Sequence, residues 1–141
     1  MTTTSIAQNK FPTYALLMLR ILLVLIFLYH GVPKAIFWTA AAEKFVGFGL
    51  PGFLGPITGI AEVIASILLL FGRFWQVSNF VLLFIIAGAL VTVQIPNYIA
   101  DASKVAGLER DLLILVGHIV LLAFQPKGVG VKQSPQSPEL Q

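Results

Sequence analysis

Four ionisable side chains occur inside apolar stretches of this sequence. Arg20 and His30 belong to the first stretch, Glu62 to the second and His118 to the last. An ionisable group in a membrane-spanning helix costs about 2.5 to 3.5 kcal/mol of insertion free energy. Such a group needs a partner or a water-filled cavity, and a titratable group in that setting can carry protons. Arg20, Glu62 and His118 are therefore the candidate catalytic residues.

Depth along the helices indicates that these three residues share one layer. With a rise of 1.5 Å per residue, Arg20 and His118 lie about 10 Å, and Glu62 about 15 Å, from the side of the termini. Two interpretations stay open. Arg20 and Glu62 form a buried ion pair that fixes helix register while His118 donates to a backbone carbonyl, or the three residues form a proton-carrying cluster.

A second polar layer is predicted near the opposite surface. Its members, the candidate binding residues for a quinone, are His30, Lys34, Gln94, Glu109 and Asp111. A quinone site needs an apolar slot for the ring and tail, with donors and a protonatable group at the head. Asp111 shares a helix face with His118 and Glu109 does not, so only one of the two acids faces inward. For Lys34 the alternative is that its ammonium snorkels to the lipid headgroups.

Several other kinds of chemistry are excluded. The chain has no cysteine, which removes disulfides, thiol redox chemistry, iron–sulfur ligation and covalent haem attachment. The two histidines have no metal-ligand spacing, so we expect no metal. The nine Lys and Arg are scattered, which argues against nucleic acid as a partner. We therefore expect no tightly bound cofactor, and a diffusible quinone as the carrier in any redox reaction.

Composition predicts the elements that must position these residues. The chain is 57% hydrophobic and 11% charged, with a mean hydropathy of +0.91, values typical of a membrane protein. The predicted fold is all-α, an integral membrane four-helix bundle with a short interfacial helix, about Thr39 to Val46, in the first loop. The spans are expected at residues 14–31, 53–72, 74–95 and 105–125, and Pro33 is expected to end the first helix.

The domain organisation follows from these spans. Residues 13–126 form the membrane domain, residues 1–12 a polar N-terminal tail and residues 127–141 a flexible C-terminal tail. In the second span the residues Gly55, Thr58, Gly59, Glu62 and Ser66 fall on one face, which we expect to point into the bundle. Gly55 and Gly59 also form a Gly-x-x-x-Gly pattern, which permits close helix approach.

The same spans give the expected topology. Four crossings place both termini on one side, and Lys and Arg outside the spans are balanced between the two sides. We expect cytoplasmic termini, because Lys34 and Arg110 are rim residues rather than loop charges. The first apolar run is interpreted as a retained helix rather than a signal peptide, because further spans follow it.

Several motifs resemble those of the DoxX family (DoxX/DoxD-like four-helix inner-membrane proteins). They are "LRILLVLIF", "HGVPK", "GFGLPGFLGPITGIAEVIASILLLFG", "VQIPNYI" and "GLERDLLIL", and together they span roughly residues 14–131. The resemblance implies a four-helix protein of a bacterial-type inner membrane. Some members are associated with quinone-linked oxidation, as in the thiosulfate:quinone oxidoreductase membrane subunit, or with membrane complexes that handle oxidative stress. The family often has a histidine where Gln94 stands, so a proton relay through that position is not open to this chain.

Three functions follow from these observations. The first is an accessory or membrane subunit of a quinone-linked redox system, with lipid around it and a soluble or membrane redox subunit as partner. The second is a non-enzymatic scaffold or assembly protein in which the charges only lock helices together. The third is a small transporter, which four helices without internal symmetry make less favoured unless the chain forms an oligomer.

Overall fold

A computed structural model of the protein describes residues 11–124. Within this range the chain forms helices and turns, without a strand. The predicted tails, residues 1–12 and 127–141, lie outside the described residues apart from Phe11 and Pro12, which already belong to the first helix. Over the described residues, the all-α prediction is confirmed.

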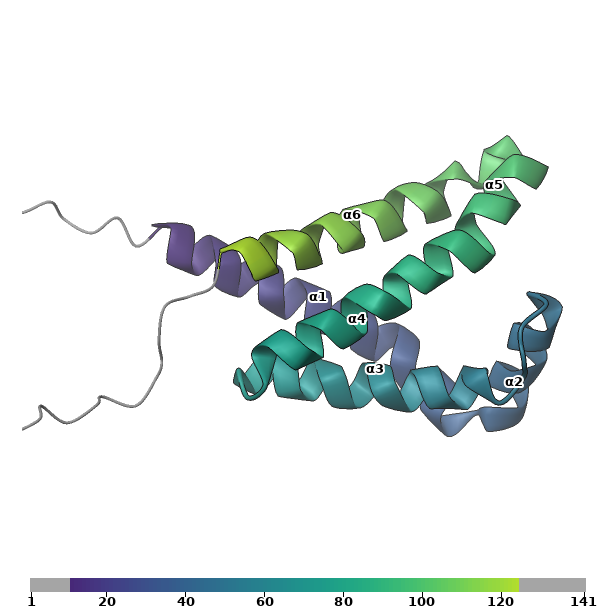
Figure 1. Cartoon of the computed structure of the whole chain (residues 1–141), viewed down its shortest axis with the longest axis horizontal. Helices are drawn as coiled ribbons and strands as arrows, with labels where there is room; N and C mark the ends of the chain where they lie inside the picture. The colour runs from purple at the N-terminus through teal and green to yellow at the C-terminus, as the bar shows by residue number, and fades with distance from the viewer. Residues whose placement is uncertain (1–10, 125–141) are drawn as a thin grey trace, which may run out of the picture.

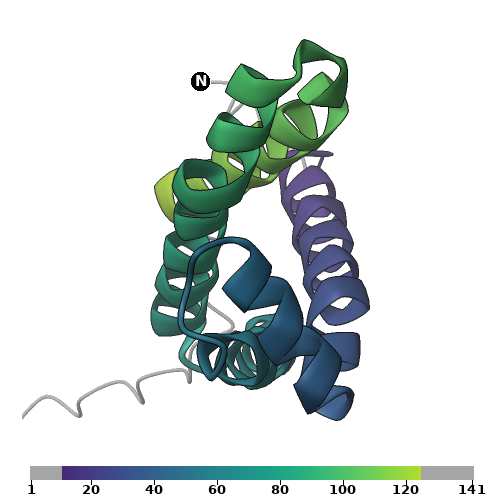
Figure 2. The ribbon, with the colours of Figure 1, turned by 90° about the vertical axis from the view of Figure 1, so that its right-hand side faces the viewer.

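Four long helices make the bundle, and short helices join them at one end (Figure 1). Each long helix contacts two others, because both α1 and α4 touch α3 and α6. Figure 2 shows α1 and α4 on opposite sides of the bundle. The elements are α1 (Phe11–Ile36), α2 (Trp38–Gly47), α3 (Leu54–Phe71), α4 (Trp75–Ala89), the π-helical turn η1 (Leu90–Gln94), α5 (Ile95–Ala100), the single turn η2 (Ala102–Lys104) and α6 (Val105–Ala123).

Three helical stretches are long and apolar enough to cross a membrane, judged by length and composition among the described residues. They are Thr13–Ile36, Leu54–Phe71 and Trp75–Ala100. The fourth predicted span corresponds to α6, which has 19 residues but carries Glu109, Arg110 and Asp111 in its first two turns. A crossing by α6 therefore stays a prediction.

The bundle interior is apolar with a few polar side chains. All four long helices contribute to one cluster of buried side chains, which comprises Leu23, Val24, Phe27, Ala65, Leu69, Leu82, Ile86, Ile114 and Leu121. Many large apolar side chains point outward instead; Phe84 is 80% exposed and Tyr29 77%. An outward apolar surface of this kind suits lipid rather than water. The fold is that of a membrane helix bundle.

Pro33 does not end the first helix, so this expectation was wrong. α1 continues through Pro33 to Ile36, and the Pro33 carbonyl accepts a hydrogen bond of 2.8 Å from the Phe37 amide. A proline inside a helix removes one backbone hydrogen bond at a cost of about 3 kcal/mol. Packing against a neighbouring helix can offset that loss in membrane bundles. Here the residues just after Pro33 pack against α3.

Two glycines of α3 bring the neighbouring helices close, as the Gly-x-x-x-Gly pattern predicts. A Cβ on Gly59 would lie 2.5 Å from the Cβ of Lys34 in α1, and one on Gly55 would collide with the carbonyl of Ala41 in α2. The inward face of α3 is confirmed as well, because Gly55, Gly59, Glu62 and Ser66 are all buried. Backbone contact therefore fixes α1 and α2 against α3.

The third span also runs further than predicted, from Trp75 through Pro96 to Ala100. In the turn η1 the Ile95 amide donates to the carbonyl of Leu90, five residues back. Pro96 follows directly in α5 and, because it has no N–H, removes one backbone hydrogen bond from this continuous helical stretch. The segment between the third and fourth predicted spans, residues 96–104, is thus mostly helical.

A short turn connects α5 to α6. The Asp101 side chain accepts hydrogen bonds from the hydroxyl and the amide of Ser103, at 2.7 and 3.0 Å. These hydrogen bonds, the side-chain one first, hold the pKa of Asp101 below its usual value. An ionised Asp101 therefore stabilises the turn η2 that precedes α6.

The close approach of α1 and α3 gives a stability prediction. Gly59→Ala should lower the free energy of unfolding by about 1 to 3 kcal/mol, because the added methyl group forces Lys34 and Ala35 away. Gly88→Ala is the matched control: its Cβ meets nothing within 4 Å, so a helix-favouring gain of about 0.5 to 1 kcal/mol is expected. Thermal unfolding in detergent, followed by circular dichroism, measures both. Equal stabilities would contradict the close contact.

Candidate functional site

An ion pair between α1 and α3 forms the centre of the site. Lys34 Nζ donates to Glu62 Oε1 at 2.5 Å. The Glu62 side chain is 3% exposed and that of Lys34 28%. Removing water from a carboxylate is costly unless a cation replaces the lost hydration. Lys34 is therefore the group that makes a buried charge at Glu62 possible.

The second carboxylate oxygen of Glu62 is not satisfied in the same way. Oε2 is buried and has no hydrogen-bond partner within residues 11–124. Gly31 lies beside it, since a Cβ on Gly31 would be 3.1 Å from Oε2 and 2.8 Å from the Glu62 Cβ. The absence of a side chain at Gly31 thus lets Glu62 enter the interface with α1, and it leaves one strong acceptor available to a ligand or a proton.

A second charged group forms where η1 meets α6. Asp111 accepts from Gln94 Nε2 at 2.9 Å through Oδ2 and from Arg110 Nε at 2.7 Å through Oδ1. Gly107 permits this approach, because a Cβ there would lie 2.5 Å from the Gln94 Oε1. The π-helical turn and a glycine together place Gln94 on the buried carboxylate.

Both groups line one cavity of about 490 Å³ at the end of the bundle that carries α2 and α5. Its size lies within the range of small-molecule sites. The polar lining residues are His30, Lys34, Lys44, Thr58, Glu62, Thr92, Gln94, Arg110 and Asp111. The apolar walls come from α1 to α4, η1 and α6, and include Ile26, Phe27, Phe45, Phe48, Phe84, Ile86 and Ile114.

Formal charges in the cavity do not balance. Lys34, Lys44 and Arg110 are cationic, whereas Glu62 and Asp111 are the two carboxylates in its lining. The lining therefore has one positive charge in excess before His30 is counted. Developing negative charge on a ligand oxygen is favoured in such a setting.

Arg20 lies away from this cavity, and the Arg20–Glu62 pair considered from the sequence does not form. Instead, Arg20 Nη2 donates to the carbonyl of Leu70, near the end of α3, where unpaired carbonyls and the helix dipole attract a cation. Glu62 is eight residues earlier in α3, a distance of about 12 Å along the helix. Arg20 thus bonds α1 to the C-terminal end of α3.

His118 is fully buried in the half of the bundle away from the cavity, and it bonds to Asn79 of α4. The His118 Nδ1 contacts the Asn79 Oδ1, and the Asn79 Nδ2 donates to the His118 carbonyl at 3.1 Å. Phe27 packs edge-on against the imidazole with ring centroids 5.3 Å apart. The expected partner of His118, a backbone carbonyl, is replaced by an amide side chain.

The second predicted layer is largely brought together. His30, Lys34, Gln94 and Asp111 line the cavity, and Glu62 joins them from the first predicted layer. Glu109 is exposed and does not line the cavity, so Asp111 is the acid that faces inward. Arg20 and His118 are not part of this group.

Sequence reasoning missed two kinds of residue. Asn79 is a buried amide in the apolar run of α4, and a polar residue in such a run is itself a signal of an interhelical hydrogen bond. Lys44 and Arg110 were treated as loop or rim charges, yet both line the cavity. No sequence pattern indicates which way these long side chains turn.

The fold and the site define a class: an all-α membrane protein with a cavity of mixed charge at one end of its bundle. The chain belongs to the DoxX family, whose sequence profile matches residues 15–95. It is also 27% identical over 114 residues, 81% of each chain, to a Bacillus subtilis (strain 168) protein named "Putative oxidoreductase CatD". No solved structure is significantly similar to the chain.

The ion pair between Lys34 and Glu62 can be tested by a double-mutant cycle. Lys34→Met alone should destabilise the protein by about 3 kcal/mol, because it leaves a buried carboxylate without its cation. In a Glu62→Gln background the same change should cost much less. Chemical unfolding in detergent measures the four free energies. Additive effects of the two substitutions would show that the pair contributes no coupling.

Proposed function

We propose that the protein is a membrane subunit of a quinone-linked redox system and that its cavity receives the ring of a diffusible quinone. The observation that carries this proposal is the cavity itself: apolar walls lead to a cluster of donors, acceptors and titratable groups. The relative named as an oxidoreductase supports the same class of reaction.

The lining fits a quinone ring on chemical grounds. Flat aromatic rings pack against apolar walls, and Phe27 and Phe45 are among the wall residues. Two ring carbonyls need hydrogen-bond donors, and Lys34, Gln94 and Arg110 carry N–H groups at the polar end. Glu62 Oε2 is a buried acceptor that finds no partner in the described chain. The N–H donors thus match the carbonyl oxygens of a quinone, and the Glu62 acceptor matches a hydroxyl group of the corresponding quinol.

The residues of the chain would divide the work between binding and proton handling. A bound quinone supplies a site for two electrons and two protons. Lys34 and Arg110 favour negative charge on the ring oxygens, while Glu62 and His30 are positioned to hold a proton at the cavity wall. The apolar side chains around them exclude water. The electrons come from a soluble or membrane redox subunit, which is the partner we propose.

A scaffold without enzymatic activity is the second candidate, and one observation favours it. Arg20 and the Asn79–His118 pair satisfy polar groups between helices and lie outside the cavity. Such bonds act as packing glue in membrane bundles. The two candidates differ in what they require of the cavity, since only the redox subunit needs it open. A small transporter is less favoured, because the charged groups gather at one end.

The same proposal includes a location. We place the chain in a bacterial-type inner membrane, crossing it several times with both termini in the cytoplasm. If α6 crosses as the fourth span, the number of spans is even and both termini lie on the same side. The cavity would then open toward the outer face of that membrane, where a partner subunit could reach it.

Cavity filling tests quinone binding directly. Gly88 lines the cavity, and a Cβ there meets nothing within 4 Å. Gly88→Leu should therefore place its side chain in the ring site and weaken binding of menadione about tenfold or more, a loss of at least about 1.4 kcal/mol. Quenching of tryptophan fluorescence on titration of the purified full chain in nanodiscs measures the affinity.

Gly47→Leu is the matched control, because Gly47 also has open space around its Cβ but does not line the cavity. The Gly47→Leu variant should bind menadione with the same affinity as the unmodified chain. Glu62→Gln adds a second comparison, since the scaffold function predicts loss of folded protein and the redox function predicts folded protein with weakened binding. Absence of menadione binding by the well-folded, unmodified chain would refute the quinone proposal.

Reporter fusions test the topology. A fluorescent protein fused after Gln141 should fluoresce in a bacterial host, and alkaline phosphatase at the same position should be inactive, because that terminus is expected in the cytoplasm. A phosphatase fusion in the segment between α2 and α3 serves as the positive control. An active phosphatase at Gln141 would contradict the proposed orientation.

A further inference from the structure

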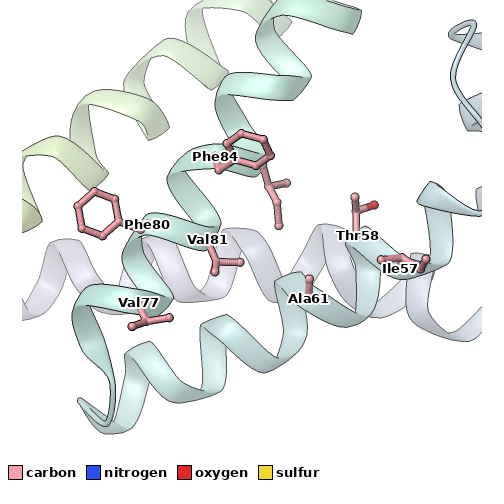
Figure 3. A pocket seen from close by; sticks show the side chains of 8 residues that line it. Ile57, Thr58, Ala61, Val77, Phe80, Val81 and Phe84 are labelled. Carbon is pink, nitrogen blue, oxygen red and sulfur yellow. The ribbon is translucent and has the colours of Figure 1, made fainter.

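A second space lies beside the cavity, in a groove between α3 and α4. Its volume is about 520 Å³. The lining residues are Ile57, Thr58, Ala61, Val77, Phe80, Val81, Phe84 and Ile85. Figure 3 shows Ala61 of α3 and Val81 of α4 facing the space between the two helices. The groove is open to the outside of the bundle, since Val77 is 61% exposed and Ile57 53%.

The groove and the cavity adjoin each other. Three residues line both spaces, namely Thr58, Phe84 and Ile85. From these residues the groove follows α4 back to Val77, eight residues or about 12 Å. That direction leads from the middle of the bilayer toward the α3–α4 turn, on the side of the termini, so the groove runs along the hydrocarbon layer. A molecule that fills both spaces would have its head in the charged cavity and its tail in the lipid core.

The chemistry of the two spaces differs sharply. The groove has one polar side chain, Thr58, whose hydroxyl lies 2.8 and 2.9 Å from the carbonyl oxygens of Leu54 and Gly55 and donates its one proton within α3. The groove therefore offers hydrocarbon contacts alone, whereas the cavity offers Lys34, Glu62 and Arg110. The ligand that matches this pair of spaces is amphipathic, with one compact polar head and an apolar tail.

We infer that the groove binds the isoprenoid tail of the quinone whose ring enters the cavity, and that the quinone enters sideways from the bilayer between α3 and α4. This inference rests on the proposed quinone-linked function and adds the ligand class: a long-tailed membrane quinone rather than a short, water-soluble one. A phospholipid acyl chain in the same groove is the competing occupant. An acyl chain needs no connection to the cavity. Competition with a ligand that binds only in the cavity therefore distinguishes the two occupants.

Photoaffinity labelling tests this assignment. The probe is a naphthoquinone whose isoprenoid tail carries a diazirine, added to the full chain in nanodiscs, and mass spectrometry locates the label. Label is expected between Ile57 and Ala61 and between Val77 and Ile85. Excess menadione, which has the ring without a tail, should remove the label, because it displaces the head. Label that persists with excess menadione, or that spreads over α1 and α6, overturns the inference.

Two pairs of variants sharpen the test. Ala61→Phe fills the groove and should lower labelling about tenfold, while the affinity for menadione stays unchanged. Ala15→Phe is the match, because Ala15 is an exposed alanine of α1 outside both spaces. If Ala61→Phe does not fold, Val77→Trp replaces it, with the exposed Val116 of α6, as Val116→Trp, for comparison.

The outcomes separate the two proposals. Menadione binding without label in the groove overturns the inference about the tail and leaves the quinone function standing. Failure of the folded chain to bind menadione overturns both. Equal labelling of the Ala61→Phe and Ala15→Phe variants, both well folded, overturns the inference as well. Groove label that disappears with menadione and with Ala61→Phe supports it.

Discussion

The buried ion pair between Lys34 and Glu62 is the interaction on which the rest of the structure depends. It joins α1 to α3 at the depth where Gly31 and Gly59 bring the two helices into contact. A carboxylate cannot stay charged in an apolar interface without a cation close by. The ammonium of Lys34 therefore fixes the register of the two helices and, at the same time, a charged wall of the cavity.

The polar residues of the bundle fall into two groups with different physical roles. Arg20, Asn79 and His118 find partners on a neighbouring helix, and these bonds hold α1 to α3 and α4 to α6. Residues of the other group line the cavity. They lie toward the end of the bundle at which α3 and α4 are far apart, opposite the turn that joins these helices (Figure 1). Divergence of these helices creates the space, and the charges at its wide end give the space its chemistry.

The helices and the inward face of α3 could be predicted because apolar periodicity and Gly-x-x-x-Gly spacing are local signals. The partners of Arg20 and Glu62 could not be predicted. Counting residues along a helix gives the depth of a side chain in the membrane but not the group that it contacts. Arg20 bonds to a backbone carbonyl, which has no sequence signature. The helix ends predicted at Pro33 and after Ile95 were wrong for a related reason: packing against α3 offsets the hydrogen bond lost at Pro33, and the π-helical turn η1 continues into α5 through Pro96.

Because of the π-helical turn η1, the direction of the Gln94 side chain depends on the number of residues in that turn as well as on the residue type at position 94. A π-helical turn holds one residue more than an α-helical turn, so everything after it is rotated by about 100° relative to an uninterrupted helix. Gln94 reaches Asp111 in this rotated frame. A relative that lacked one residue in this turn could keep the glutamine and still direct it away from α6. When related sequences are compared, a gap at this turn is therefore as informative as a substitution.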